Sequence, residues 1–474
     1  MTPFKLICRD PQGAEVNYLY QPHTSMLTHE DGRRIDLDSV GLSYDESPKA
    51  WEPAAIGHPD FPLGKNKSIT TLKIQMGLKC NYSCAYCNQA SQPHDVHGSL
   101  NDAQAFLDKL PSWFDGGVGG TGQGVTIEFW GGEPFVYWKT LKLLAPEMRK
   151  RYPDAHFNII TNGSVLDQEK VDFLCELGFG VGISHDGDAY EHNRGTDPLK
   201  NPAMLKWIKL LHSRLHAEGR LGFNCVLTKN NYSLASIRKY IAEHLEVPLS
   251  EVNLSTEEYL LPYDNSALEM CPQTEDDYQA MNHQVFQEIV TREALGVGTI
   301  RQKMEDFFKS ISQARPAYVL GQKCGMDSPS ALAVDVTGNV MTCQNTSAAT
   351  KHKVGGIEAF EEIALTTAYH WTTRDECPKC PVVQLCRGAC LFLEGEFWEK
   401  ACRNSFEYNL TILAGCIHFL TGTVLTRVEG ENIRYDGVSS VNSIDYDFVA
   451  SGFTQKNWQS PVRRRMIPIV VAHA

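Results

Sequence analysis

Ten of the 15 cysteines in this chain of 474 residues fall into two short arrays, and this clustering constrains the fold more than any other feature. The first array consists of Cys80, Cys84 and Cys87, with Tyr86 directly before the third cysteine. Closely spaced thiolates are typical ligands of an iron–sulfur cluster or of a zinc ion. Three thiolates would leave one iron of a [4Fe–4S] cluster open to bind and act on a small molecule. A Cys₃His zinc site is the alternative, and the spacing alone leaves both open.

The second array lies between residues 324 and 402. Its members are Cys324, Cys343, Cys377, Cys380, Cys386, Cys390 and Cys402. A zinc ribbon could account for the four cysteines between residues 377 and 390 taken by themselves. The other five cysteines of the chain are expected to be small buried hydrophobic residues. These are Cys8, Cys175, Cys225, Cys271 and Cys416.

Composition narrows the choice of partners. The formal net charge of −13 argues against nucleic acid, because phosphate binding needs a basic surface. The run from Arg463 to Arg465 is a local exception that we interpret as a solvated stretch. The N-terminus has no apolar signal segment, and the most apolar run, 411–424, is interrupted by polar residues and glycines and is interpreted as a buried helix. We therefore expect a cytoplasmic protein with no membrane contact, in which clustered cysteines serve metal or redox chemistry.

Strand and helix patterns alternate from about residue 68 onward. The predicted strands are 69–76, 125–130, 157–161, 181–184, 221–227 and 252–255. The clearest helix begins after Asn201 as its cap and places Leu205, Ile208, Leu211 and Leu215 on one face. The spacing leaves room for one βα unit each time, which predicts an α/β fold with a parallel barrel or open barrel. Residues 1–67 predict only a short β-rich segment without the helices of a winged-helix domain.

Small and polar residues follow several of these strands, where the active sites of parallel barrels lie. They are Gly131, Gly132, Glu133 and Pro134 after the second strand, Asn162 after the third, Ser184, Asp186 and Arg194 around the fourth, and Asn224 on the fifth. The paired glycines allow close approach to a ligand, and an arginine suits recognition of a carboxylate.

Together these motifs resemble those of radical S-adenosylmethionine (SAM) enzymes with a C-terminal SPASM domain, over about residues 69–405. The resemblance implies a partial (β/α)₆ TIM-like barrel in which Cys80, Cys84 and Cys87 hold a [4Fe–4S] cluster whose open iron binds SAM. It implies that Gly131 to Pro134 contact the methionine amino group and that Ser184 and Asp186 lie near the ribose or carboxylate. Tyr86, Asn162, Arg194 and Asn224 would complete the SAM site.

The resemblance also implies two auxiliary iron–sulfur clusters. One would be held by Cys377, Cys380, Cys386 and Cys402, and the other by Cys324, Cys343 and Cys390. An eighth cysteine of some relatives has no counterpart in residues 325–330. The fourth position of the second cluster is therefore left to a non-cysteine ligand such as Asp327, to an open iron or to a smaller cluster.

The expected organisation is a β-rich segment (1–67), a radical SAM barrel (68–315), a SPASM domain (316–410) and a C-terminal extension (411–474).

The resemblance implies modification of a ribosomally made peptide or protein, with thioether or carbon–carbon crosslinking favoured and oxidation of Ser or Cys to formylglycine as the alternative. It further implies an electron donor of the flavodoxin or ferredoxin type, and any leader peptide would bind a separate partner or another surface. An alternative hypothesis, from a different functional class, is a non-catalytic iron–sulfur or zinc protein for electron transfer or binding.

Overall fold

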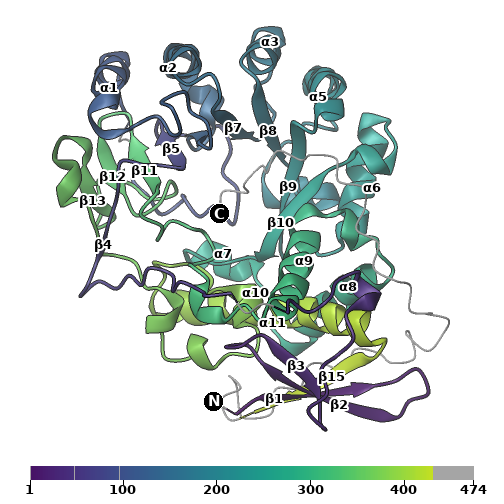
Figure 1. Cartoon of the computed structure of the whole chain (residues 1–474). Coiled ribbons are helices and arrows are strands. Elements are labelled where there is room, and N and C mark those ends of the chain that lie inside the picture. Colours follow the sequence, from purple (N-terminus) through teal and green to yellow (C-terminus); the bar gives the residue numbers. More distant parts are fainter. Residues whose placement is uncertain (1, 47–48, 95–96, 431–474) are drawn as a thin grey trace.

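A nine-stranded sheet forms the centre of the computed structural model, which describes residues 2–46, 49–94 and 97–430 (Figure 1). Six consecutive parallel strands make up most of this sheet. They are β5 (Thr71–Gln75), β6 (Thr126–Trp130), β7 (His156–Thr161), β8 (Phe179–Ser184), β9 (Leu221–Leu227) and β10 (Leu254–Tyr259). The predicted α/β fold with a partial barrel is confirmed, and the sheet stays open with β10 at one edge.

Helices cover the outer face of the parallel strands in an arc (Figure 1). They are α1 (Leu100–Trp113), α2 (Trp138–Arg151), α3 (Gln168–Glu176), α5 (Pro202–Leu215) and α6 (Leu234–Leu245), with the short α4 (Tyr190–Asn193) between β8 and α5. Helix α5 begins as its sequence predicts, because the Asn201 side chain accepts a hydrogen bond from the amide of Ala203. Its apolar face buries Ile208, Leu211 and Leu215 against the sheet core.

The sheet continues beyond β5 with three strands that the sequence analysis did not predict. They are β11 (Ala331–Asp335), β12 (Asn339–Met341) and β13 (Lys353–Gly356). Strand β11 pairs in parallel with β5, with Leu332 opposite Leu72, whereas β12 and β13 are antiparallel additions. The part of the chain that carries the second cysteine array is therefore joined to the first by a continuous hydrogen-bonded sheet.

A second sheet lies below the barrel in Figure 1 and joins the two ends of the described chain. Its strands are β1 (Phe4–Arg9), β2 (Glu15–Gln21), β3 (Met26–His29) and β15 (Val424–Glu429). The β-rich N-terminal segment was predicted, but its pairing of β1 with β15 was not. No α-helix precedes Leu100 among the residues described. The arginine run 463–465 lies outside the described residues.

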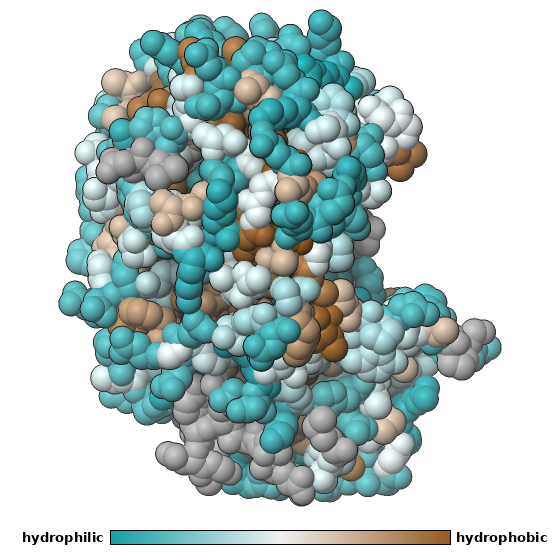
Figure 2. Space-filling view, turned by 90° about the vertical axis from the view of Figure 1, so that its left-hand side faces the viewer, coloured by the Kyte–Doolittle hydropathy of each residue, from teal (hydrophilic) through white to brown (hydrophobic). Residues whose placement is uncertain are grey.

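The remaining helices follow β10 in the chain, and two of them carry Cys386 and Cys402 of the second cysteine array. They are α7 (Asn265–Met270), α8 (Glu275–Val290), α9 (Gly298–Ser312), α10 (Val383–Cys386) and α11 (Gly395–Thr421), and β4 (Leu63–Gly64) pairs separately with β14 (Ala364–Leu365). Helix α11 has 27 residues and runs without a break through residue 410, where the SPASM domain was expected to end. Almost every residue from 404 to 420 is buried. None of the described helices combines the length and apolar character needed to cross a bilayer. The face in Figure 2 is mainly hydrophilic, with an apolar patch near its middle.

Candidate functional site

A cavity of about 490 Å³ opens at the carboxyl ends of the parallel strands, where the sequence analysis places the active site. The predicted SAM-binding residues in its wall are Tyr86, Gly131, Gly132, Glu133, Asn162, Ser184, Arg194 and Asn224. Pro134 and Asp186 are not in the wall. Pro134 begins a 3₁₀ turn that leads into α2, and Asp186 lies behind Arg194. Their predicted contact with SAM thus has no counterpart in the cavity lining.

The loop after β5 brings all three cysteines of the first array to this cavity. Closely placed thiolates in a cavity wall suit an iron–sulfur cluster or a zinc ion. Burial raises the pKa of the Cys80 thiol to about 11. The thiol must therefore release its proton when it binds a metal.

The two glycines after β6 lie in the cavity wall and also against the cysteine loop. A Cβ atom on Gly132 would lie 2.4 Å from the carbonyl oxygen of Leu78 and 2.6 Å from that of Lys79. The amide of Gly132 donates to the carbonyl of Gly77 at 3.1 Å, and the amide of Glu133 donates to that of Lys79 at 3.1 Å. The glycines therefore let the end of β6 lie directly on the cysteine loop, and these amides are not available to a ligand.

Glu133 is held rigidly in the cavity wall. Its carboxylate accepts hydrogen bonds from the hydroxyl of Thr161 and the amide of Asn162, each at 2.8 Å, and from the amide of Phe135 at 3.2 Å. Burial raises the pKa of Glu133 to about 7, although these three donors oppose the shift. A cationic group entering the cavity would favour the ionised form of this carboxyl.

Asp186 and Arg194 form a buried ion pair that sets the position of the arginine. The Arg194 guanidinium donates to both carboxylate oxygens, at 2.8 and 3.2 Å. The hydroxyl of Tyr86 donates to the same carboxylate at 2.5 Å, and the amide of Val226 donates at 3.2 Å. The negative Asp186 keeps the pKa of Arg194 well above its usual value despite burial. Asp186 thus acts on the cavity by orienting Tyr86 and Arg194, which are both in its wall.

Three buried donors in the cavity wall find no hydrogen-bond partner in the described part of the chain. They are the indole nitrogen of Trp130 and the amide nitrogens of Asn88 and Asn224. Unpaired buried donors are costly, so their gathering in one cavity indicates a polar ligand. The cavity volume is in the range of small-molecule sites, about 300–1,000 Å³. The residues therefore fit a molecule of the size and polarity of SAM.

The second cysteine array divides into the two groups that the resemblance implies. Cys377, Cys380, Cys386 and Cys402 line one void. Cys324, Cys343 and Cys390 line another, and burial raises the pKa of the Cys343 thiol to about 12. Asp327, the suggested fourth ligand, is not in the wall of that void. Its carboxylate instead accepts a hydrogen bond from the amide of Gln322 at 2.9 Å and lies 3.9 Å from His370.

Side chains near the two cysteine arrays connect them directly. The side-chain amide of Gln75, at the end of β5, donates to the backbone carbonyls of Gln344 at 2.7 Å and Thr346 at 2.9 Å, just after Cys343. Gln89, two residues after Cys87, donates to the side-chain oxygen of Asn345 at 3.1 Å. The loops that follow Cys87 and Cys343 are therefore held against each other.

The sequence analysis missed several residues between the main cavity and the Cys324 void. Leu261 and Tyr263 line both spaces, and Glu257 lines the cavity with its carboxylate 3.8 Å from the Lys323 ammonium. Glu257 was missed because the sixth strand was predicted to end at residue 255, whereas β10 continues to Tyr259. Leu261 and Tyr263 follow the end of this strand, and their sequence carries no signal that marks them.

Comparison with known proteins identifies the domain built around this cavity. The family profile of the Radical SAM superfamily matches residues 74–230. This chain carries a radical SAM domain. A radical SAM domain implies an enzyme that uses SAM and a [4Fe–4S] cluster.

Two curated relatives match this radical SAM protein over only part of their own length. A radical SAM cyclopropyl synthase, TigE, from Paramaledivibacter caminithermalis is 23% identical over 35% of this chain and 37% of its own length. An S-adenosylmethionine-dependent nucleotide dehydratase from Psychrobacter lutiphocae is 22% identical over 28% of this chain and 46% of its own length. The chain thus spans less than half the length of either relative.

Among solved structures, anSMEcpe with bound AdoMet and Cp18Cys peptide shares the fold of this radical SAM protein. It has a TM-score of 0.50 and 19% identity, and the alignment covers 73% of this chain and 98% of that one. The likeness extends beyond the family match, because 73% of the chain exceeds residues 74–230.

Proposed function

We propose that this radical SAM protein is a SPASM-type enzyme that modifies side chains of a ribosomally made peptide or protein, most specifically by forming a thioether or carbon–carbon crosslink. The observation that carries the proposal is the division of ten cysteines into three groups, one at the SAM-sized cavity and two in voids close to it. The fold shared with a protein solved with AdoMet and a peptide supports a peptide as the substrate class.

The residues of each group suit a particular cofactor. Cys80, Cys84 and Cys87 would hold the [4Fe–4S] cluster and the other seven cysteines two auxiliary clusters. When bound, these groups and SAM would supply a radical that removes a hydrogen atom from the substrate and an acceptor for the electron left behind. The chain's own groups would position the reactants: Trp130 and Asn224 lie in the cavity wall, and their side-chain nitrogens have no hydrogen-bond partner in the described part of the chain.

Crosslinking also requires that a substrate proton be removed, and Glu257 is the group we assign to this role. It lies in the cavity wall near Tyr263, on the side that adjoins the Cys324 void. The ammonium of Lys323 lies 3.8 Å from this carboxylate and would hold it in place.

Cofactor content and SAM cleavage test the enzyme class. Anaerobically reconstituted protein should contain about ten to twelve irons, roughly four per cubane cluster, and should release 5′-deoxyadenosine on reduction. Replacing Cys80, Cys84 and Cys87 together with alanine should abolish this product and leave the C-terminal iron in place. Cys175→Ala, outside all three groups, is the matched control. Cleavage by the triple variant would contradict the assignment, and a protein that binds clusters without cleaving SAM would be the non-catalytic alternative.

The substrate itself can be sought in the gene neighbourhood as a short precursor peptide. Incubation with the reconstituted enzyme should remove a pair of hydrogens and join two residues, which tandem mass spectrometry detects as missing fragment ions between them. An aldehyde that reacts with a hydrazide would instead indicate oxidation of Ser or Cys to formylglycine.

A further inference from the structure

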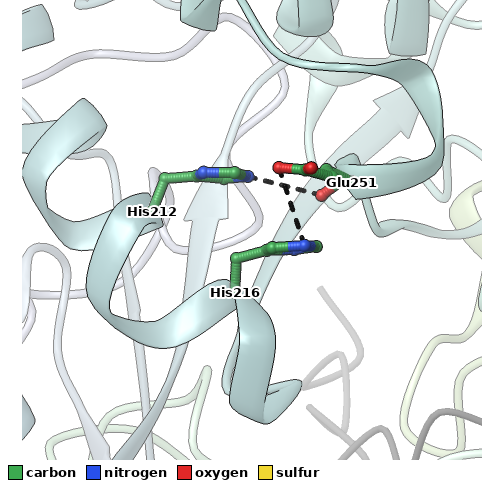
Figure 3. A group of neighbouring side chains, drawn as sticks. All are labelled: His212, His216 and Glu251. Carbon is green, nitrogen blue, oxygen red and sulfur yellow. Dashed lines mark hydrogen bonds and ion pairs between the residues drawn. The ribbon is translucent and has the colours of Figure 1, made fainter.

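A second cluster of metal-binding side chains lies outside the cavity described above. His212 in α5 and His216, at the start of the 3₁₀ helix His216–Glu218, are one helical turn apart, and Glu251 ends the 3₁₀ helix Leu249–Glu251. In Figure 3 the two imidazole rings lie one above the other and face Glu251. The rings are nearly parallel, with centroids 4.7 Å apart. Their ligand atoms and the Glu251 carboxylate all lie within 4.8 Å of one another.

This His–His–Glu cluster lies at the opposite end of the sheet from the cysteine triplet. His216 precedes the amino end of β9, and Glu251 precedes the amino end of β10, whereas the cavity lies at the carboxyl ends. None of the three residues lines the cavity or either cysteine void. The proposed peptide chemistry therefore does not account for them.

We propose that His212, His216 and Glu251 form a binding site for one divalent transition-metal ion, with Zn²⁺ as the best match. Two imidazoles and one carboxylate are a known zinc ligand set, which leaves a fourth position for water. A tetrahedral ion with bonds of about 2.1 Å holds its ligand atoms about 3.4 Å apart. The distance from His216 Nε2 to the Glu251 carboxylate is 3.6 Å, and every other pair of ligand atoms is within 4.8 Å, so each pair would have to close by at most about 1.4 Å.

The present contacts of the cluster are weak and partly open to solvent. At present Nε2 of His212 lies 3.4 Å from the backbone oxygen of Glu251, a weak contact that a metal bond would replace. The side chain of Glu251 is 34% exposed, which gives an ion and a water molecule access from solvent.

Such an ion would join two successive βα units at the open edge of the barrel. The α5–β9 connection supplies the histidines, and the segment entering the edge strand β10 supplies the glutamate. Binding only to the folded chain should therefore stabilise this edge.

Zinc binding to cluster-loaded protein tests the site, because loaded cysteines do not compete for the added metal. Equilibrium dialysis against Zn²⁺ under anaerobic conditions, followed by elemental analysis, should give one additional zinc per chain. His216→Ala and Glu251→Gln should each weaken binding tenfold or more and lose the zinc-dependent rise in melting temperature. Glu218→Gln, a nearby exposed carboxylate outside the cluster, should bind as the unmodified protein does. Iron content and circular dichroism verify that each variant is folded.

The zinc X-ray absorption edge provides a second readout that does not depend on the variants. The expected ligands are two imidazoles and oxygen, without the sulfur contribution at about 2.3 Å that cysteine ligands would give. Absence of added zinc, equal zinc binding by all four proteins, or sulfur in the first coordination sphere would each overturn the proposal. Because 5′-deoxyadenosine formation is measured separately, failure of this site would leave the proposed function untouched.

Discussion

Arg194 and Asp186 make a two-point ion pair, with Nε to Oδ2 at 2.8 Å and Nη2 to Oδ1 at 3.2 Å, in which the carboxylate is fully buried. Asp186→Ala would leave the guanidinium buried without its partner, and we expect the free energy of unfolding to fall by about 3–5 kcal/mol. Denaturant titration measures this loss. Lys200→Ala, which breaks an exposed ion pair with Glu191, should have little effect. Similar small losses in both variants would show that Asp186 does not hold Arg194.

Gly132→Ala tests the contact between the end of β6 and the cysteine loop. The new methyl group would lie 2.4 Å from a backbone oxygen that cannot move independently, so the loop that carries Cys80 must shift. We expect the variant to lose roughly four irons, the content of one cubane cluster, together with SAM cleavage. Gly64→Ala, whose Cβ would be 3.7 Å from its nearest neighbour, is the control. Full iron content with normal cleavage in Gly132→Ala would refute this role.

Tyr263→Phe tests the link between the cavity and the Cys324 void. Burial raises the pKa of the Cys390 thiol, and a hydrogen bond donated by the Tyr263 hydroxyl to its sulfur partly opposes this rise. Hydrogen bonds to cluster sulfurs stabilise the reduced state, so their loss should make the reduction potential of this cluster more negative while iron content stays constant. A redox titration followed by electron paramagnetic resonance measures the shift. Tyr369→Phe, whose hydroxyl bonds Glu394 instead, should leave the potential unchanged.

Glu407→Gln tests a pH dependence of stability that arises in α11. Burial raises the pKa of Glu407 to about 7 from its usual 4.5, so the folded chain binds this proton more tightly than the unfolded chain. The stability contribution is therefore full below pH 4.5 and is lost as the pH rises through about 7. We expect the variant to gain stability relative to the unmodified protein between about pH 5 and about pH 8. Parallel stability curves for the two proteins would contradict the assignment.

The local parts of the fold could be predicted from the sequence because they depend on neighbouring residues. The Asn201 cap and the apolar spacing of α5 lie within one segment, and the parallel strands recur at the spacing of βα units. Pairings between distant segments could not be predicted, since β11 joins β5 and β15 joins β1 only after the whole chain has folded. Neither pairing leaves a distinct pattern in the short strands themselves.

In the candidate site, the grouping of residues was easier to predict than the function of each. Glycines permit close approach, but the sequence does not tell whether a ligand or the chain's own backbone comes near, and at Gly132 it is the backbone of Leu78 and Lys79. The same holds for Asp186, whose charge was expected to face a ligand and is instead used to orient Arg194.

The pairing of β5 with β11, and the hydrogen bonds from Gln75 to the segment after Cys343, make the first cysteine loop and the Cys324 void parts of one rigid frame. A flexible linker would let the two separate to admit substrates of different sizes, whereas here separation would require breaking a five-pair strand ladder. Under the proposed function, the gap between the reacting carbon and an electron acceptor in the Cys324 void would then be a fixed length. A substrate would have to match that length with its own geometry, so the frame would select which side chains can react.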